Sequence, residues 1–486
     1  MVDKGLRGCW CFLRTVPFRV FGVVEIGRHD CEFAESGTGI LPVVRRSLQT
    51  WASPNLRPSA SSFAKATEDR TAGRSPMPHR TTDNSDVWRQ LASARTVRDR
   101  VRVPYFDHNA TTPLSPIARE AWLRASDESW QNPSSPYRDA ARVRARLEQC
   151  REQLAQPIGG AADRIVFNSG ATEGANAVLA HWAKTLPPGR KIAVNPTEHP
   201  CVVEAARHGF APERLVWLEL DGHGVVQLEG LEALLTDGVV GAVSVMAANN
   251  ETGVVQPWSE ISALCRRHRV AYHCDASQWL GKLPSSGLGA AGWVTATAHK
   301  FGGPKGVGFL VRPEQAEGFR SQQGGEQERG HRAGTEDFPA IAAMVAALAD
   351  TEATKVLLET ERLCWRDAFV VRVRSAVPGV QVVGAKAERL WNTVSLIMPH
   401  AENHRWVVKL DRRGFQVSTG SACSTGRVGP SPVLAAMGLA ADEAKRAIRI
   451  SAGWETTQDE WLQLASALAA TDVELRVAAS PDVVRV

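Results

Sequence analysis

From Val101 onward, short apolar stretches alternate with longer segments in which apolar residues recur at helical spacing. The apolar stretches predict strands at residues 164–168, 191–195, 241–247, 270–274, 293–297 and 307–311. Strands that are apolar almost throughout and separated by helices are typical of a mostly parallel sheet covered on both faces. The pattern therefore predicts an α/β fold. Polar residues follow these strands, so we expect a site at the carboxyl edge of the sheet.

A second region follows toward the C-terminus. Residues 340–363 predict one long helix, because apolar residues such as Ile341, Met344 and Leu348 recur at helical spacing. Beyond it, strands are expected near 380–383 and 392–398, and helices near 404–413, 431–437 and 457–469. We expect the long helix to lead into a smaller C-terminal α+β domain.

Residues 1–100 have a different composition. They lack sustained periodicity, and residues 47–82 are rich in Ser, Pro, Arg and Thr. Such a segment buries too little apolar surface to offset its ordering entropy, which predicts a disordered extension with a helix near 86–98. A translation start near Met77 is consistent with this. The alternative of a targeting peptide is disfavoured by early acidic residues, namely Asp3, Glu25, Asp30, Glu32 and Glu35.

Composition and charge limit which classes of protein this chain can belong to. Hydrophobic residues make up 43% of the chain and charged residues 22%, as in ordinary globular proteins. No apolar run reaches the length of about 18 residues that indicates a membrane span. The first 100 residues hold 16 Lys/Arg against 10 Asp/Glu and so account for the net charge of +5, which gives little support for a nucleic-acid partner.

The nine cysteines are odd in number and irregularly spaced. Cys9 and Cys11 are too close in sequence for a usual zinc pair, and no second pair follows them. We therefore expect a cytoplasmic protein with free thiols and no metal site. Most of these thiols are expected to be packed and inert, but Cys423 stands in a run of small polar residues, 417–426, which predicts an exposed loop and allows a reactive thiolate.

Asp275 and Lys300 each follow a predicted strand, so both can point into one crevice. Pyridoxal phosphate (PLP) requires this pair of residue types. A lysine amine forms the Schiff base, and a carboxylate pairs with the pyridinium nitrogen so that the ring can accept electrons. Taken singly, each residue is much more readily an ordinary side chain at a strand end.

Three further features fit the same cofactor. Residues 169–174 form a Gly-containing turn between a strand and a helix, where free amides bind phosphate; the alternative is a simple turn capped by Thr172. Thr297, three residues before Lys300, adds a hydroxyl to the same group. His199 can lie flat on a pyridine ring, although an isolated histidine is more often a loop residue.

Taken together, the motifs resemble those of the NifS/IscS-type cysteine desulfurases, class V of the fold-type I PLP enzymes. The likeness runs in order from about Val103 to about Trp461. Its motifs are YFDHNATTP at 105–113, NPSS at 132–135, SGATE at 169–173, NNETG at 249–253, DASQ at 275–278, HK at 299–300, GPKG at 303–306, RAGT at 332–335 and GSAC at 420–423. The resemblance implies a large PLP-binding domain at 117–354, a small domain at 355–486, and an N-terminal segment at 101–116 that packs on the small domain.

The resemblance also implies a role for each matching residue. Lys300 would hold PLP covalently and move the substrate Cα proton, and Asp275 would contact the pyridine nitrogen. Cys423 would take the sulfur of L-cysteine as a persulfide and release alanine. The remaining implied contacts are Asn250 and Gln278 to the ring oxygen, His199 stacked on the ring, Ala171, Thr172, Thr297 and His299 near the phosphate, Thr335 to the phosphate in the other subunit of a homodimer, and Arg449 to the substrate carboxylate.

Two departures from the family pattern stand at Tyr137, where a histidine is common, and at Trp454, where an arginine is common. A selenocysteine lyase or a class V aminotransferase of the same fold remains an alternative, although an aminotransferase needs no loop cysteine. A non-catalytic scaffold is disfavoured because Lys300 and Asp275 are both present. The persulfide acceptor, in iron–sulfur assembly, tRNA thiolation or cofactor synthesis, is not identified by any motif.

Overall fold

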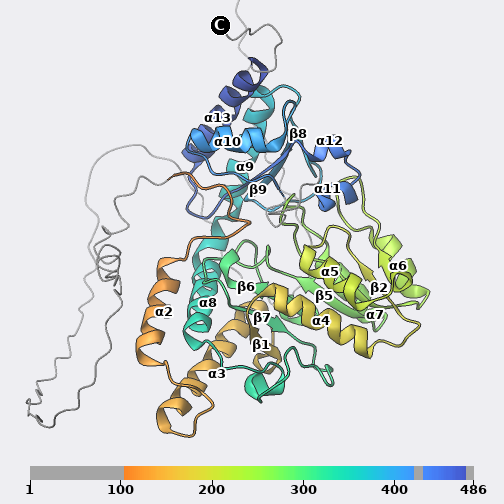
Figure 1. The fold of residues 1–486 in the computed structure, drawn as a ribbon, viewed down its shortest axis with the longest axis vertical. Helices are drawn as coiled ribbons and strands as arrows, with labels where there is room; N and C mark the ends of the chain where they lie inside the picture. The colour runs from red at the N-terminus through yellow and green to blue at the C-terminus, as the bar shows by residue number, and fades with distance from the viewer. Residues whose placement is uncertain (1–102, 421–430, 478–486) are drawn as a thin grey trace, which may run out of the picture. The chain divides into compact units, whose positions relative to one another are not determined.

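The computed structural model describes residues 103–420 and 431–477, which contain both regions predicted from the pattern (Figure 1). The predicted disorder of residues 1–100 and the predicted helix near 86–98 lie outside the described residues. Within the described ranges, no helix combines the length and the apolar character needed to cross a membrane.

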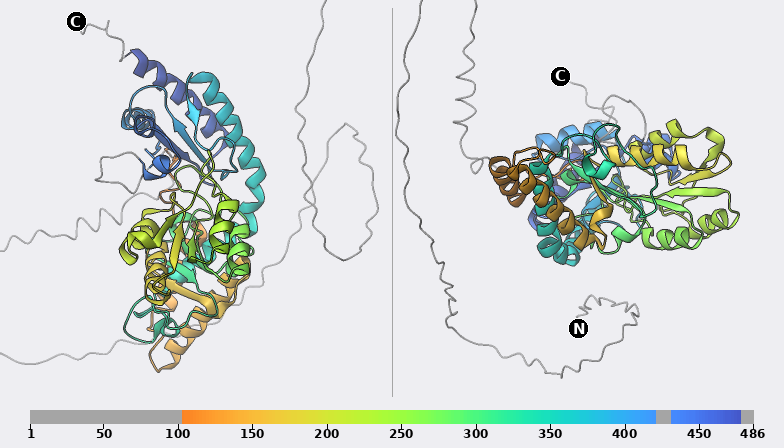
Figure 2. Two further views of the ribbon diagram at one scale, coloured as in Figure 1. Left: turned by 90° about the vertical axis from the view of Figure 1, so that its right-hand side faces the viewer. Right: turned by 90° about the horizontal axis from the view of Figure 1, so that it is seen from below.

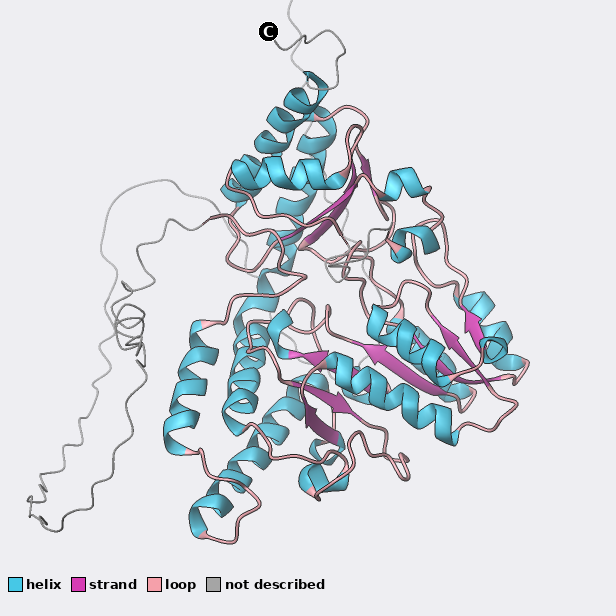
Figure 3. Cartoon of the chain, viewed as in Figure 1, coloured by secondary structure: helices cyan, strands magenta, loops and turns pink. Residues whose placement is uncertain are grey.

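The larger region is built on a seven-stranded sheet of order β1-β7-β6-β5-β4-β2-β3 (Figure 3). Its neighbouring strands are parallel except for β7, which runs antiparallel to both β1 and β6. The strands are β1 (Ile165–Asn168), β2 (Lys191–Val194), β3 (Leu215–Trp217), β4 (Val240–Ser244), β5 (Ala271–Asp275), β6 (Trp293–Thr297) and β7 (Gly308–Val311). The predicted α/β fold with a mostly parallel sheet is confirmed; β3 was not predicted.

Helices cover both faces of this sheet (Figures 1 and 2). Leu179, Trp182 and Val202 pack with Ala242 on one face. Ile261 packs with the next strand residue, Val243, on the other face, as alternation along a strand requires. The helices are α2 (Pro116–Glu128), α3 (Arg138–Ile158), α4 (Ala171–Thr185), α5 (Pro200–Gly209), α6 (Leu228–Thr236), α7 (Trp258–Arg267) and α8 (Phe338–Asp350).

The prediction of one continuous helix at 340–363 is wrong, because an irregular segment separates two helices in this part of the chain. α8 ends at Asp350, a π turn and a 3-10 turn follow, and α9 runs over Glu359–Ala376. The hydroxyls of Thr351 and Thr354 donate to the carbonyls of Ala347 and Asp350 at 2.7 and 2.6 Å. Such back-bonding competes with the helical ladder and bends helices.

The C-terminal region holds a three-stranded antiparallel sheet of order β10-β9-β8. Its elements are β8 (Gln381–Val382), β9 (Thr393–Ile397), α10 (Asn403–Arg412), α11 (Pro432–Ala436), α12 (Ala441–Ala444), β10 (Ala447–Ser451) and α13 (Gln458–Val477). The strands and helices expected here are present. β10 was not predicted, and α13 continues beyond the predicted end at residue 469.

The first described residues pair with this C-terminal region. Tyr105 and Asp107 form bridges with Gln416 and Ser451. Between them, Phe106 is fully buried and packs edge-on against Trp461, with ring centroids 5.0 Å apart. The segment then turns toward the carboxyl edge of the large sheet, where Thr112 N–H donates to the His299 carbonyl at 2.8 Å. The exact domain boundaries stay predictions.

Candidate active site

A cavity of about 520 Å³ lies where β5 and β6 end and α4 begins. This is the edge at which open α/β sheets bind ligands. Ten of the residues predicted from the sequence line it: Ala171, Thr172, His199, Asn250, Asp275, Gln278, Thr297, His299, Lys300 and Arg449. The structure thus brings together residues that are up to 278 positions apart in the chain.

Lys300 ends a short 3-10 turn directly after β6, and its amine reaches the N-terminal segment. Nζ donates to the Ala110 carbonyl at 2.8 Å and also to the Asn109 carbonyl. Asp275 is the last residue of β5 and is buried, and its Oδ1 accepts from the Ser277 amide at 2.9 Å. Among the described residues the buried Ser277 hydroxyl has no hydrogen-bond partner, which leaves a donor at this wall of the cavity.

The N-terminus of α4 opens on the same cavity. Its N-cap is Gly170, with φ of 142°, and no side chain caps the helix. The alternative of a turn capped by Thr172 is therefore wrong, because Thr172 lies inside the helix. A Cβ at Gly170 would stand 3.1 Å from the Thr297 hydroxyl, so glycine keeps this approach open. The first amides of a helix lack internal partners and attract anions, which fits a phosphate group.

Two histidines on the cavity wall have pKa values below the ordinary value, which favours the neutral form. Burial lowers the pKa of His199, an effect that Asp275 opposes and Lys300 reinforces. Its Nδ1 accepts from the Cys201 amide at 3.2 Å at the start of α5. Burial, together with three nearby lysines, lowers the pKa of His299 to about 4. Neutral rings can lie against a charged cofactor without adding a positive charge.

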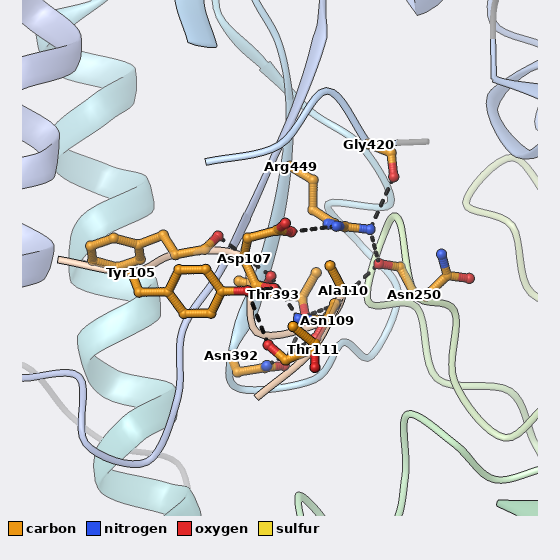
Figure 4. Close-up of polar contacts among 12 residues, drawn as sticks. Tyr105, Asp107, Asn109, Ala110, Thr111, Asn250, Asn392, Thr393, Gly420 and Arg449 are labelled. Carbon is orange, nitrogen blue, oxygen red and sulfur yellow. Dashed lines mark hydrogen bonds and ion pairs between the residues drawn. The ribbon is translucent and has the colours of Figure 1, made fainter. Parts of the chain in front are cut away.

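Arg449 is the central polar residue of β10 and is fully buried (Figure 4). One terminal nitrogen donates to the carbonyls of Gly420 and Asn250 at 3.0 and 3.2 Å, and the other pairs with Asp107 at 2.5 Å. Within the described ranges, the buried Nε of Arg449 has no hydrogen-bond partner. A guanidinium fixed in this way at a cavity wall is suited to a carboxylate ligand.

Asn109 links the two regions, and no role was predicted for it. Its Nδ2 donates to the Thr393 hydroxyl at 2.9 Å and to the Asn250 carbonyl at 3.1 Å (Figure 4). Its backbone carbonyl accepts from Lys300 and from Gln278 Nε2. The residue lies in the YFDHNATTP motif, but its contacts come from distant parts of the chain that no local pattern indicates. Cavity-lining residues without a predicted role also include Thr111, Glu173, Ser277 and Lys305.

Two predicted site residues do not line the cavity in the described structure. Thr335 is exposed and lies outside the cavity, so its predicted role depends on a second copy of the chain. Cys423 lies outside the described residues. The described residues on either side of its segment lie next to the cavity wall: Gly420 contacts Arg449, and the Ser431 hydroxyl donates to the buried Glu251 at 2.6 Å.

The two departures from the family pattern lie away from this cavity. Tyr137 is 50% exposed and precedes α3. Trp454 packs against Trp391 with tilted rings whose centroids are 4.1 Å apart, and its Nε1 donates to the Gly281 carbonyl at 2.7 Å. It lines a second cavity of about 410 Å³ on the other side of Lys300. Trp454 is not among the described hydrogen-bond partners of Arg449.

The fold and the lysine–aspartate pair at adjoining strand ends define a class V PLP enzyme. The chain belongs to the aminotransferase class-V family, whose model matches residues 104–464. It is 34% identical over 369 residues to a cysteine desulfurase IscS of Dictyoglomus turgidum, a match that spans 74% of this chain and 92% of that protein. These findings confirm the predicted family and its PLP cofactor.

Solved structures agree with this assignment. A NifS-like protein superposes with a TM-score of 0.70 at 29% identity, over 77% of this chain and 100% of that one. A structure described as SspA in complex with cysteine superposes with a TM-score of 0.61 at 26% identity, over 72% of this chain and 98% of that one. The described fold is thus that of the NifS-like enzymes.

Proposed function

We propose that this protein is a cysteine desulfurase that uses PLP to remove sulfur from L-cysteine, giving L-alanine and a persulfide on Cys423. The observation that carries the proposal is the cavity in which Lys300, Asp275 and Arg449 converge. The first two match what PLP needs, and the third matches what an amino-acid carboxylate needs. Cysteine desulfurase relatives, and a neighbouring structure that holds cysteine, support the choice of substrate.

The donor set of the cavity fits PLP. The uncapped amides of α4, with Thr172 and Thr297, would hold the phosphate. The Asp275 carboxylate would pair with the pyridine nitrogen, and the neutral His199 ring would lie on the ring face. Asn250 and Gln278 would hold the ring oxygen, and His299 would lie on the phosphate side. When bound, PLP supplies an electron sink for bond changes at the substrate Cα.

Lys300 acts as the proton carrier of the site. Its Nζ is held between the carbonyls of Asn109 and Ala110, which fixes the amine at the end of β6. From that position Nζ takes the proton from the substrate Cα and later returns a proton to carbon. General acid–base transfer of this kind contributes roughly 10²–10⁴-fold to the rate. Asn109 and Ala110 therefore serve as positioning groups.

Arg449 orients the substrate. The ion pair with Asp107 and the carbonyl contacts fix its guanidinium before the substrate binds. A carboxylate that enters the cavity meets a preset fork of N–H donors, so little side-chain entropy is lost on binding. This orientation directs the rest of the amino acid, including its sulfur, toward Lys300.

Cys423 is the proposed sulfur acceptor. It stands three residues after Gly420, whose carbonyl contacts Arg449, and three residues of chain can span at most about 11 Å. The Cys423 thiolate attacks the substrate sulfur, a sulfur–sulfur bond forms, and the carbon–sulfur bond breaks with its electron pair going to carbon. Protonation of that carbon yields alanine, and the persulfide remains on the enzyme.

The proposal also covers the oligomeric state of the enzyme, its location and its sulfur acceptor. The enzyme acts as a homodimer in which Thr335 of one copy reaches the phosphate in the other copy, since Thr335 is exposed and away from its own cavity. It acts in the cytoplasm and passes the persulfide sulfur to an acceptor protein, such as one for iron–sulfur assembly or thiolation. The mass of the protein in solution tests the homodimer, and sulfur transfer to candidate acceptor proteins tests the acceptor.

The test of the proposal is the release of alanine and sulfide from L-cysteine, with selenocysteine assayed beside it. Cys423→Ser should lose alanine formation from cysteine. The matched control is Cys364→Ser, at an exposed free cysteine on α9, which should keep wild-type activity. If Cys423→Ser forms alanine at the wild-type rate, the persulfide route is wrong, and a lyase or aminotransferase activity of the same fold takes its place.

A further inference from the structure

Lys282 is a buried lysine on the far side of the active-site lysine, and no role has been assigned to it. It is 3% exposed and stands in the turn after β5. It lines the second cavity, together with Lys300, while Lys300 also lines the active-site cavity. Among the described residues no carboxylate pairs with this amine, and burying an amine in this way is costly, which suggests that the position has a function.

The amine of Lys282 is hydrogen-bonded to one cavity-lining side chain. Its Nζ donates to Gln278 Oε1 at 2.5 Å and to the Gln278 carbonyl at 3.3 Å. Gln278 Nε2 in turn donates to the Asn109 carbonyl at 3.0 Å, which also accepts from Lys300. One chain of contacts therefore runs from Lys282 through Gln278 and Asn109 to the catalytic amine.

This arrangement decides which end of the Gln278 amide faces the active site. A charged lysine carries three donors and no acceptor, so the atom that accepts from charged Lys282 is the amide oxygen. The amide nitrogen then faces the other way, and it has two hydrogens. One is used on Asn109, and the second is available to an oxygen atom in the cavity that Gln278 lines. If the amide were reversed, the Gln278 oxygen would face the oxygen atom in the cavity, and the two would repel each other.

We propose that Lys282 is a positioning residue that fixes Gln278 as a hydrogen-bond donor to the ring oxygen of PLP. This inference rests on the proposed function, because it requires PLP in the cavity. A donor at the ring oxygen stabilises its ionised form. Lys282 thereby keeps the bound cofactor in its reactive ionisation state down to lower pH, without touching either cofactor or substrate.

The groups around Lys282 affect both its charge and its position. Burial, together with the positive charges of Lys300 and Arg449, holds the pKa of Lys282 well below its ordinary value. Its backbone carbonyl accepts from Trp391 Nε1 at 3.0 Å, which fixes the turn. The titratable or charged groups around it are Lys300, Arg449 and His299, with Tyr105, His108 and Glu455 on the walls of the second cavity.

The test is a pH titration of the visible absorbance of the PLP-loaded enzyme. Lys282→Met keeps the length of the side chain and removes the donor, so the midpoint should rise by about one pH unit, the equivalent of one hydrogen bond. In a Gln278→Ala background the same substitution should cause no further shift. Lys184→Met, which removes an exposed charge from α4, is the control and should titrate as wild type.

A second readout separates this role from a structural one. The cofactor-free Lys282→Met protein should unfold at the wild-type temperature or above, because an apolar side chain replaces a buried amine. A wild-type midpoint in Lys282→Met, or an equal shift with and without Gln278, would overturn the positioning role alone. A wild-type enzyme without a visible cofactor band would overturn the proposed function and this inference together.

Discussion

Removing one partner of the buried ion pair between Arg151 and Glu328 should cost more stability than removing one partner of an exposed ion pair among the described residues. Arg151 lies on α3 and Glu328 lies in the segment before α8; their side chains are 2% and 1% exposed. Two guanidinium nitrogens donate to the two carboxylate oxygens at 2.7 and 2.9 Å. Glu328 also accepts from the Phe167 amide on β1 at 2.7 Å, so the pair joins three segments.

Arg151→Met should lower the free energy of unfolding by about 3–5 kcal/mol, because it leaves the Glu328 carboxylate buried without its counter-charge. The matched control is Arg142→Met on the same helix. Arg142 pairs with Asp139 at 2.7 Å, but those side chains are 61% and 55% exposed. Removal of an exposed pair of this kind should cost less than about 1 kcal/mol.

The assay is urea unfolding followed by far-UV circular dichroism, with all variants stripped of cofactor. A double variant, Arg151→Met with Glu328→Gln, should recover most of the loss, since no uncompensated charge remains. Glu328 and Arg329 have positive φ of 49° and 56°, a conformation that the pair stabilises. If Arg151→Met costs no more than Arg142→Met, the reasoning about this pair is refuted.

Further outcomes are expected. Lys300→Ala should lose the Schiff-base absorbance of the wild-type enzyme and all alanine formation; a wild-type spectrum together with wild-type activity would show that another residue forms the Schiff base. Burial lowers the pKa of His273 from its ordinary 6.5 to about 4, with Asp275 opposing, so the folded state binds fewer protons. Stability should therefore be complete above pH 6.5 and fall as the pH drops toward 4, and His273→Gln should flatten this fall in thermal unfolding. A chain that starts at Met77 should match the full chain in activity and melting temperature, and a large loss would assign the extension a role.

The strands that carry the candidate site could be predicted because their apolar runs are local. β5 and β6 are short, almost wholly buried strands followed by polar residues, and the strand ends at Asp275 and near Lys300 follow from that pattern. Parallel pairing then brings strand ends to one edge without further information. The same reasoning located the helix that begins at Ala171, since a Gly-containing turn precedes it.

The elements that were missed depend on distant contacts. β10 has Arg449 at its centre, and a charged residue interrupts the apolar pattern of a buried strand. Its charge is compensated by Asp107, which lies 342 positions earlier in the chain. β3 has only three residues and lies at the sheet edge, where little apolar burial marks it.

The burial of particular polar side chains could not be predicted from the sequence either. A lysine in a turn, such as Lys282, is ordinarily solvent-exposed. It is buried here, in a turn whose backbone carbonyl at Lys282 accepts from Trp391 of the C-terminal region. The interruption between α8 and α9 was missed for a related reason. The apolar spacing continues through it, while the hydroxyl of Thr351 bonds back to the helix.

The central claim is that sulfur passes from L-cysteine to Cys423. The most direct test is mass spectrometry of the PLP-loaded enzyme after it reacts with one equivalent of L-cysteine in the absence of reductant, with the alanine released measured in the same sample. The peptide that contains Cys423 should gain the mass of one sulfur atom, in proportion to the alanine formed. Alanine formation with an unmodified Cys423 peptide, or with the added sulfur on Cys364, would contradict the account.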